Sequence, residues 1–182
     1  MFIQTEETPN PSTLKFIPGL IVMPEGTADF RGAESAGRSP LAKSLFALPG
    51  IEGVFLGSDF ISVTKAAPAE WFTVKPAVLA AIMDHFTAGL SVIEEAEATL
   101  ADAPEDSEIV VQIKEILDAR VRPAVAQDGG DIVFHDFTDG VVYLEMHGSC
   151  SGCPSSTATL KAGIENMLRY YIPEVREVRA VA

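Results

Sequence analysis

The stretch VVYLEMHGSCSGCPSS, residues 141–156, carries the only two cysteines of this 182-residue chain, Cys150 and Cys153. Its first six residues, VVYLEM, include β-branched and aromatic side chains and predict a strand that runs directly into the cysteine loop. After the loop, apolar residues recur at helical spacing until Pro173; they are Leu160, Ile164, Met167, Leu168 and Tyr171. The two thiols are therefore predicted on a turn between a strand and a helix.

The residues of this turn favour a soft metal centre. Pro154 and the two serines after it are typical of the first turn of a helix, which places Cys153 at the positive end of the helix dipole. Because that field stabilises thiolates, we expect both cysteines to be acidic and reactive. Gly148 and Gly152 allow backbone conformations that bring N–H groups close to sulfur.

Two cysteines separated by two residues are also compatible with other chemistry, since zinc sites, iron–sulfur sites and thioredoxin-type dithiols share this spacing. A structural zinc and an iron–sulfur cluster both usually take four ligands. One chain therefore holds half a site, unless two chains share it or the pair works by redox chemistry. His147 could complete a zinc set, but a single histidine at a strand end is more often solvated, and we do not assign it to the site. Asp128 and Asp131 flank two glycines and indicate a turn rather than a hard-cation site.

The second half of the chain predicts a small domain of helices and strands. Ser107 can cap a helix with an apolar stripe, and Pro123 is expected to kink or end that helix. The remaining predicted elements are strands: 132–137 and 141–146, paired as a hairpin around 138–140, and 175–181.

The first half predicts the order β-β-α-β-β-α. Ser39 can cap a helix with Pro40 at its first position, which Pro49 and Gly50 end. The other predicted elements are strands at 1–7 and 13–19 around the turn TPNPS, a hairpin of 53–57 and 59–65, and a helix over Pro76 to Phe86. Trp71 and the phenylalanines of this half are expected in the core.

The charge distribution divides the chain. Residues 1–87 carry 6 basic and 9 acidic side chains, residues 107–182 carry 7 and 11, and residues 88–106 carry none and 6. The middle stretch also contains small residues and a proline, as a solvated tether does. We predict an α+β protein: two small α/β-sandwich-like domains, 1–87 and 107–182, joined by the acidic linker 88–106.

Composition excludes several classes of partner. The net charge of −13 repels nucleic acid and anionic membrane surfaces, so protein partners are expected. No apolar run is long enough to span a bilayer. The first residues, MFIQTEETPNP, are typical neither of a signal peptide nor of a transit segment, which predicts a cytoplasmic location where thiols stay reduced.

The segments RPAVAQDGGDI (122–132) and GSCSGCPSSTATLK (148–161) resemble the NifU C-terminal domain of Nfu-type iron–sulfur carriers, and the resemblance covers 107–182. TEETPNPSTLKFIPG (5–19) resembles the N-terminal domain found in one branch of that family. In this family the two motif cysteines bind a labile cluster that is handed to apo-proteins, and Cys150 and Cys153 match both positions. Mitochondrial members carry a transit segment, so the resemblance implies a bacterial cytoplasm or a mature organellar form.

The resemblance implies a carrier that is not an enzyme. It would take a cluster from an upstream assembly scaffold and deliver it to apo iron–sulfur proteins. Since a cluster takes four thiolates, we expect a 4Fe-4S cluster, with 2Fe-2S as the alternative, bridging Cys150 and Cys153 of two chains. The apo form would be a monomer and the loaded form a homodimer. A thiol-disulfide oxidoreductase and a zinc-binding interaction domain remain as alternatives.

Overall fold

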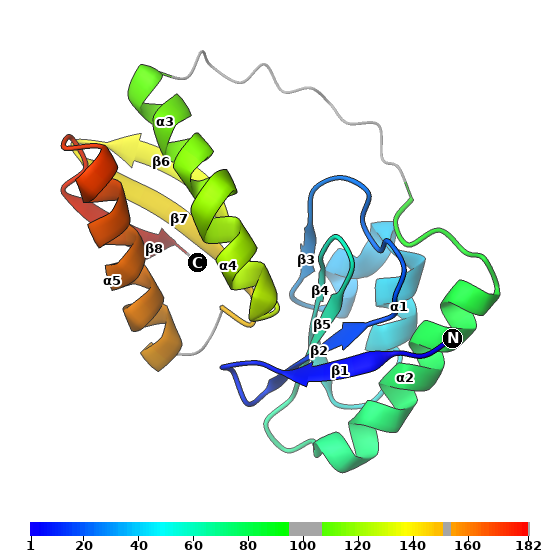
Figure 1. Ribbon diagram of the computed structural model, residues 1–182. Coiled ribbons are helices and arrows are strands. Elements are labelled where there is room, and N and C mark those ends of the chain that lie inside the picture. Colours follow the sequence, from blue (N-terminus) through cyan, green and yellow to red (C-terminus); the bar gives the residue numbers. More distant parts are fainter. Residues whose placement is uncertain (95–106, 151–153, 182) are drawn as a thin grey trace. The chain divides into compact units, whose positions relative to one another are not determined.

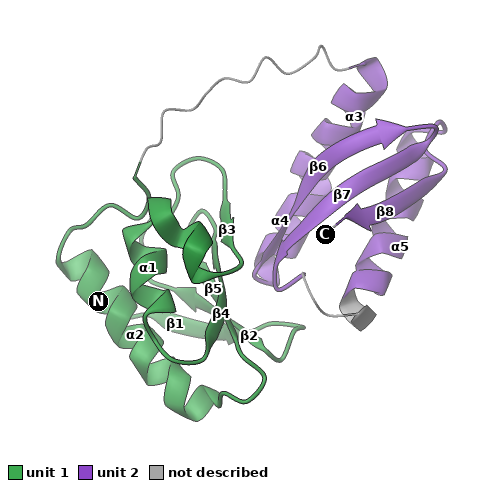
Figure 2. Ribbon diagram, turned by 180° about the vertical axis from the view of Figure 1, so that it is seen from behind, with its two compact units in different colours: residues 1–98 green, residues 99–182 purple. Residues whose placement is uncertain are grey.

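The computed structural model describes residues 1–94, 107–150 and 154–181. The chain forms two compact units, Met1–Ala98 and Thr99–Ala182, which Figure 2 colours separately. The division falls inside the stretch 88–106 that was predicted as a linker. Each unit combines one sheet with helices, which confirms the α+β fold class.

Unit 1 is a five-stranded antiparallel sheet packed against helices (Figure 1). The strands, in sheet order, are β1 (Gln4–Glu7), β2 (Thr13–Ile17), β5 (Ile61–Lys65), β4 (Ile51–Leu56) and β3 (Ala28–Phe30). The helices are a 3₁₀ helix (Ala33–Arg38), α1 (Pro40–Phe46) and α2 (Trp71–Thr87). Their apolar faces form one core with the sheet, in which Leu41 and Leu45 of α1 and Val78 and Ile82 of α2 are fully buried.

The predicted elements of unit 1 are present, with three corrections. Ser39 caps α1, its Oγ accepting the Ala42 N–H at 3.1 Å. The short edge strand β3 and the 3₁₀ helix were not predicted. Helix α2 begins at Trp71, before the predicted start at Pro76. Pro76 has no N–H to donate to the carbonyl of Phe72, but Phe72 is 94% exposed, so water can bond that carbonyl and the helix tolerates the proline. Phe72 and Phe2, which is 80% exposed, were therefore wrongly assigned to the core.

The predicted linker starts too early. Val92 and Ile93 pack against the core of unit 1. Ser39 Oγ donates to the carbonyl oxygen of Val92 at 2.6 Å, and the N–H of Glu94 donates to the carbonyl oxygen of Arg38 at 2.7 Å. Unit 1 therefore extends through Glu94, and the rest of the predicted linker, 95–106, lies outside the described residues.

Unit 2 is a three-stranded sheet with all its helices on one face, as Figures 1 and 2 show from opposite sides. Its elements are α3 (Glu108–Ile116), a π-helix (Leu117–Val121), α4 (Arg122–Gln127), β6 (Gly130–Thr138), β7 (Val141–Gly148), α5 (Pro154–Tyr171) and β8 (Glu177–Val181). Strand β7 is central, antiparallel to β6 and parallel to β8. The core joins Ile113, Leu117 and Val125 of the first helical segment to Ile164 and Leu168 of α5.

The capping and turn signals of unit 2 are confirmed. Ser107 Oγ accepts the Val110 N–H at 3.4 Å, and the β6–β7 turn places Asp139 and Gly140 at φ of 53° and 81°, as a tight hairpin requires. The predicted helix that starts after Ser107 changes from α-helix to π-helix at Leu117–Val121, before it reaches Pro123. The N–H of Arg122 donates to the carbonyl of Leu117, five residues back, and Pro123 then stands in the first turn of α4, where a missing N–H costs little.

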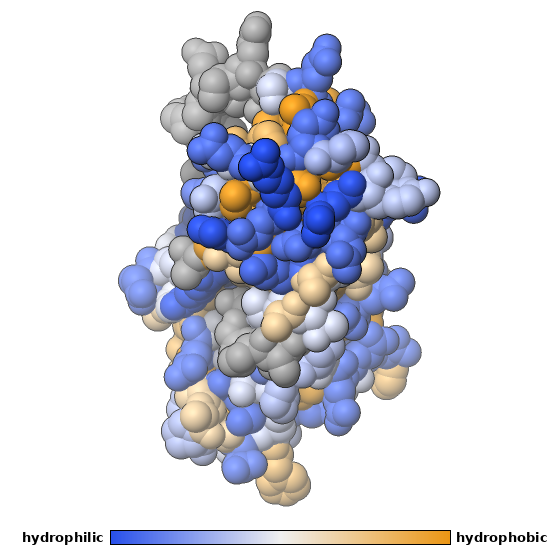
Figure 3. Space-filling model, turned by 90° about the vertical axis from the view of Figure 1, so that its left-hand side faces the viewer, coloured by the Kyte–Doolittle hydropathy of each residue, from blue (hydrophilic) through white to orange (hydrophobic). Residues whose placement is uncertain are grey.

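Hydrophilic side chains dominate the face of the molecule in Figure 3, and hydrophobic side chains are visible in smaller areas between them. None of the helices in the described ranges has both the length and the apolar character that crossing a bilayer would need.

Candidate metal centre at the cysteine loop

Cys150 lies where the central strand of unit 2 ends. Strand β7 finishes at Gly148, which adopts a φ of 64°, two residues before the cysteine. The Cys150 side chain is only 7% exposed and belongs to the hydrophobic core of the unit. Cys153, the second predicted ligand, lies outside the described residues.

Three hydrogen bonds hold Ser149 and Cys150 against their neighbours. The N–H of Ser149 donates to the carbonyl of Gly129 at 3.2 Å, and Ser149 Oγ donates to the carbonyl of Asp128. From the other side, Thr157 Oγ1 in α5 donates to the carbonyl of Cys150 at 3.1 Å. The cysteine is therefore fixed between the turn that follows α4 and the first turns of α5.

Gly130 makes room for the sulfur, and sequence analysis missed this role. A Cβ built on Gly130 would lie 2.5 Å from Cys150 Sγ and 2.9 Å from the carbonyl oxygen of His147. No real side chain tolerates such contacts, so only glycine fits beneath the thiol. The available signal was a second consecutive glycine at the start of a strand, which marks a close approach of another group.

Asp131 belongs to an ion pair beside this cradle. Its side chain is 5% exposed and receives two bonds from Arg122, Nε to Oδ1 and Nη2 to Oδ2, each 2.9 Å long. Its Oδ1 also accepts the Ile132 N–H at 2.8 Å, and Arg122 Nη1 reaches Asp118 at 3.0 Å. The hydrogen bonds to Asp131 raise the pKa of Arg122 above its ordinary value. Asp131 thus stands in β6 as a structural anion, whereas the sequence indicated a residue of the turn.

The described residues supply no complete metal site within one chain. His147 Nε2 lies 3.2 Å from Glu145 Oε1, a contact along the sheet. Among the residues whose placement is described, no three or more histidine, cysteine, aspartate or glutamate side chains gather as a metal site would require.

The Cys150 thiol is not acidic, contrary to expectation. Burial raises its pKa to about 11, the Asp128 carboxylate adds to the rise, and a hydrogen bond with Ser149 opposes it. The sequence argument considered the helix field but could not foresee that this side chain joins the core. In the metal-free chain Cys150 is therefore a neutral thiol at physiological pH.

This difference predicts slow alkylation of Cys150 in the metal-free chain. In a Cys153→Ser variant, where Cys150 is the only thiol, iodoacetamide at pH 8 should react at least about tenfold more slowly than with N-acetylcysteine amide, because thiolate is the reactive form. The rate should rise as the pH approaches 11. A rate at pH 8 equal to that of the small thiol would contradict the burial of Cys150.

Comparisons with known proteins cover both units. The family model "Scaffold protein Nfu/NifU N terminal" matches residues 3–89, and the model "NifU-like domain" matches residues 113–179. The relatives include "NFU1 iron-sulfur cluster scaffold homolog, mitochondrial" of Drosophila sechellia and of Drosophila virilis, each 53% identical over 184 residues and covering 100% of this chain. This chain spans 65% and 62% of their respective lengths.

A solved structure, the solution structure of a NifU-like protein from Saccharomyces cerevisiae, matches with 25% identity and a TM-score of 0.48. The matched region covers 53% of this chain and 87% of the yeast chain. The family assignment rests on the two family models, which together account for most of the chain. The chain belongs to the Nfu/NifU family, and in it an Nfu/NifU N-terminal domain precedes a NifU-like domain.

Proposed function

We propose that this chain is an iron–sulfur cluster carrier whose cluster is cargo, bound by Cys150 and Cys153 and passed to apo-proteins. The observation that carries the proposal is the cradle around Cys150, where Gly130 leaves space for sulfur and three hydrogen bonds hold Ser149 and Cys150 in place. The names of the relatives, which describe iron–sulfur cluster scaffolds, support the same chemistry.

The number of ligands favours a cluster shared by two chains. A cluster ligated only by thiolates takes four of them, and each chain has two cysteines. A 4Fe-4S cluster between two Cys150–Cys153 pairs satisfies this number, and a 2Fe-2S cluster does so as well. A homodimer joined mainly by its cluster separates when the cluster leaves. An acceptor that offers its own cysteines can then replace one pair of thiolates at a time.

The partners in this proposal are an upstream scaffold that donates the cluster and apo iron–sulfur proteins that receive it. The carrier itself turns over no small molecule. Both thiols must stay reduced, which requires a reducing compartment. The names of the relatives place those proteins in mitochondria and give no support to the bacterial cytoplasm predicted from the sequence.

The two alternatives have weaker support. A thiol-disulfide oxidoreductase needs an accessible nucleophile of low pKa, whereas burial raises the pKa of Cys150 to about 11. A zinc-stapled domain would need further ligands that the described part of a single chain does not bring together.

Analysis of iron, acid-labile sulfide and zinc in the anaerobically purified full chain tests the proposal. A four-iron cluster shared by two chains gives about two irons and two sulfides per chain. A colourless protein with one tightly held zinc per chain would end the carrier hypothesis.

Gly130→Ala is expected to weaken cluster retention. The added methyl group would lie only 2.5 Å from Cys150 Sγ, so the cysteine side chain or the strand must shift, and displaced support around a metal ligand typically costs about tenfold or more in affinity. The measurement is the rate at which the absorbance of the cluster decays when an iron chelator is added after anaerobic reconstitution. Gly163→Ala in α5 is the matched control, because a Cβ there meets nothing within 4 Å. Equal rates in the two variants would contradict the role of Gly130.

A further inference from the structure

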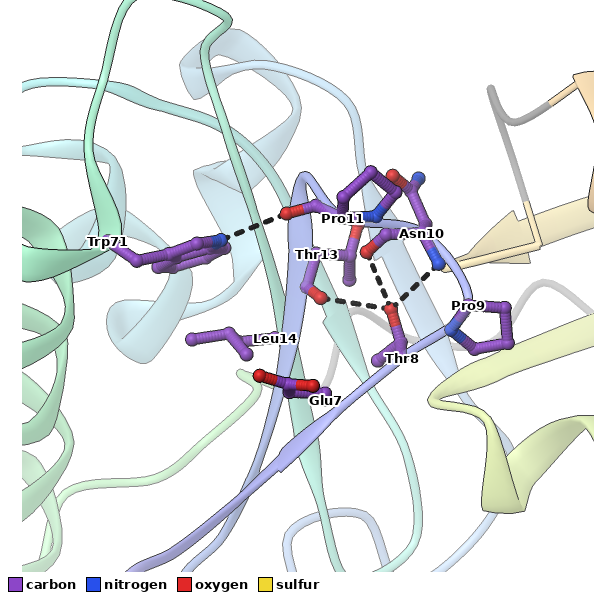
Figure 4. A pocket seen from close by; sticks show the side chains of 8 residues that line it. All are labelled: Glu7, Thr8, Pro9, Asn10, Pro11, Thr13, Leu14 and Trp71. Atoms are coloured by element: carbon purple, nitrogen blue, oxygen red, sulfur yellow. Dashed lines mark hydrogen bonds between the residues drawn. The ribbon is translucent and has the colours of Figure 1, made fainter.

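A second candidate site lies in unit 1, between the β1–β2 turn and the start of α2 (Figure 4). It is a cavity of about 240 Å³. Its lining includes the carboxylate of Glu7, the indole of Trp71, the side chain of Leu14 and the rings of Pro9 and Pro11. A pocket that combines apolar side chains with one acidic group is suited to a ligand that is partly apolar and positively charged.

The turn that forms one wall is rigid. Pro9 and Pro11 fix their own backbone φ angles, and Thr8 Oγ1 lies 2.9 Å from the carbonyl oxygens of both Asn10 and Thr13. The same oxygen accepts the Asn10 N–H at 3.2 Å, while Asn10 Oδ1 accepts the Ser12 N–H at 3.0 Å. Side-chain bonds to nearby backbone groups stabilise such a turn, so the pocket is formed before any ligand arrives.

Trp71 is held in place opposite this turn. Its Nε1 donates to the carbonyl of Pro11 at 3.1 Å, a bond drawn in Figure 4, and its ring packs against the core of unit 1. The sequence indicated a core tryptophan, but the indole also lines the pocket. An indole fixed at the wall of a pocket presents a surface on which a cation can rest.

Glu7 supplies an uncompensated negative charge. It pairs with Leu14 in the β1–β2 ladder and points to the same side of the sheet as Ile3, which packs against the core. Its neighbour Glu6 reaches Lys15 Nζ at 3.6 Å. The exposed Glu7 carboxylate, by contrast, forms no hydrogen bond or ion pair with any residue that the structure describes. This acidic group on the helix side of the sheet is therefore available to a cation from a partner.

Strand β1 also forms an edge of the five-stranded sheet. An edge strand can pair with an extended segment of another protein, which then directs alternate side chains to each face of the sheet. A side chain directed to the helix side near Glu7 would enter the pocket.

We propose that this pocket binds an arginine side chain carried by an extended segment of a partner protein. The methylene groups of the arginine pack against Leu14 and the prolines, and its planar guanidinium meets both the Glu7 carboxylate and the Trp71 indole. The charge of the chain, −13, favours basic partners in general. This binding site is separate from the cysteine loop and goes beyond cluster binding.

Fluorescence offers a direct test, because Trp71 is the only tryptophan of the chain. The probe is the blocked peptide acetyl-Thr-Val-Arg-Val-Thr-amide, titrated into the full apo-chain. We expect a saturable change in Trp71 emission. Two changes should each raise the Kd by at least about fivefold, because each removes a charge-assisted contact. One replaces the arginine of the peptide by citrulline, its neutral isostere, and the other is Glu7→Gln in the protein.

Glu52→Gln is the matched control, because it removes an exposed carboxylate from β4 of the same unit and should leave the Kd unchanged. Equal affinity for the arginine and citrulline peptides, or an unaltered Kd in Glu7→Gln, would overturn the proposal. Tighter binding of the matching lysine or glutamate peptide would overturn the assignment to arginine. The iron content of Glu7→Gln should equal that of the parent chain, which separates failure here from failure of the carrier function.

Discussion

A chain carrying Cys150→Ser or Cys153→Ser is expected to purify without colour and without a cluster-dependent dimer. In the shared site proposed above, each chain would give two of the four thiolates, so one substitution would remove two ligands from every assembled cluster. A serine hydroxyl does not ionise near neutral pH and cannot replace them. Absorbance and sedimentation, measured before and after anaerobic reconstitution with iron and sulfide, follow the cluster and the association separately.

Burial of Cys150 calls for a second variant at this position. Serine places a hydroxyl in the core of unit 2, where an unsatisfied polar group costs stability. Cys150→Ala keeps the apolar contacts while removing the ligand, and it should remain folded by circular dichroism yet fail to assemble a cluster. A parent protein that holds a full cluster as a monomer would refute the shared site. Dimers that persist in Cys150→Ala would show that association does not depend on the cluster.

The parts of the fold that could be predicted from the sequence are those set by neighbouring residues. Ser39 with Pro40, and Ser107, start helices through bonds that reach three residues along the chain. Asp139 and Gly140 form a hairpin turn because their own φ angles are positive. Strand β7 and helix α5, which flank the cysteine loop, follow from the same kind of local signal.

The parts that could not be predicted depend on residues far apart in the chain. The parallel pairing of β8 with β7 follows from the path of α5 and carries no local signature. The contact between Gly130 and Cys150 Sγ joins a turn to a loop twenty positions later. Burial of Cys150 depends on the same packing, which explains why its pKa was expected to fall and instead rises. The motif predicts Cys150 and Cys153 as the site residues, but the environment of Cys150 could be described only from the fold.

Arg122 and Asp131 show how much stability such a distant pair can carry. They are nine positions apart, at the start of α4 and in β6, and their bidentate contact ties the helical segment to the strand that begins at Gly130. The Asp131 side chain is 5% exposed and that of Arg122 is 35% exposed. If Arg122 is removed, Asp131 stays ionised or must take up a proton inside the protein, and both outcomes cost free energy.

Arg122→Gln is therefore expected to lower the free energy of unfolding of unit 2 by about 3 kcal/mol, the lower end for breaking a buried pair, since Arg122 retains solvent contact. In a domain of this size the Tm then falls by about 12 to 24 °C. Calorimetry of the full chain records both units, whereas fluorescence of Trp71, the only tryptophan, follows unit 1, whose transition should not move.

Arg179→Gln is the control for this prediction, because Arg179 pairs with Glu177 at 3.0 Å on the exposed surface and its loss should leave both transitions in place. Adding Asp131→Asn to Arg122→Gln removes the stranded carboxylate and should restore part of the lost stability. If Arg122→Gln unfolds at the temperature of the parent chain, or if the second substitution destabilises it further, the charge of Asp131 is not what Arg122 compensates. A cradle displaced by the loss of this pair should also release its cluster faster, because β6 carries Gly130 beside Cys150.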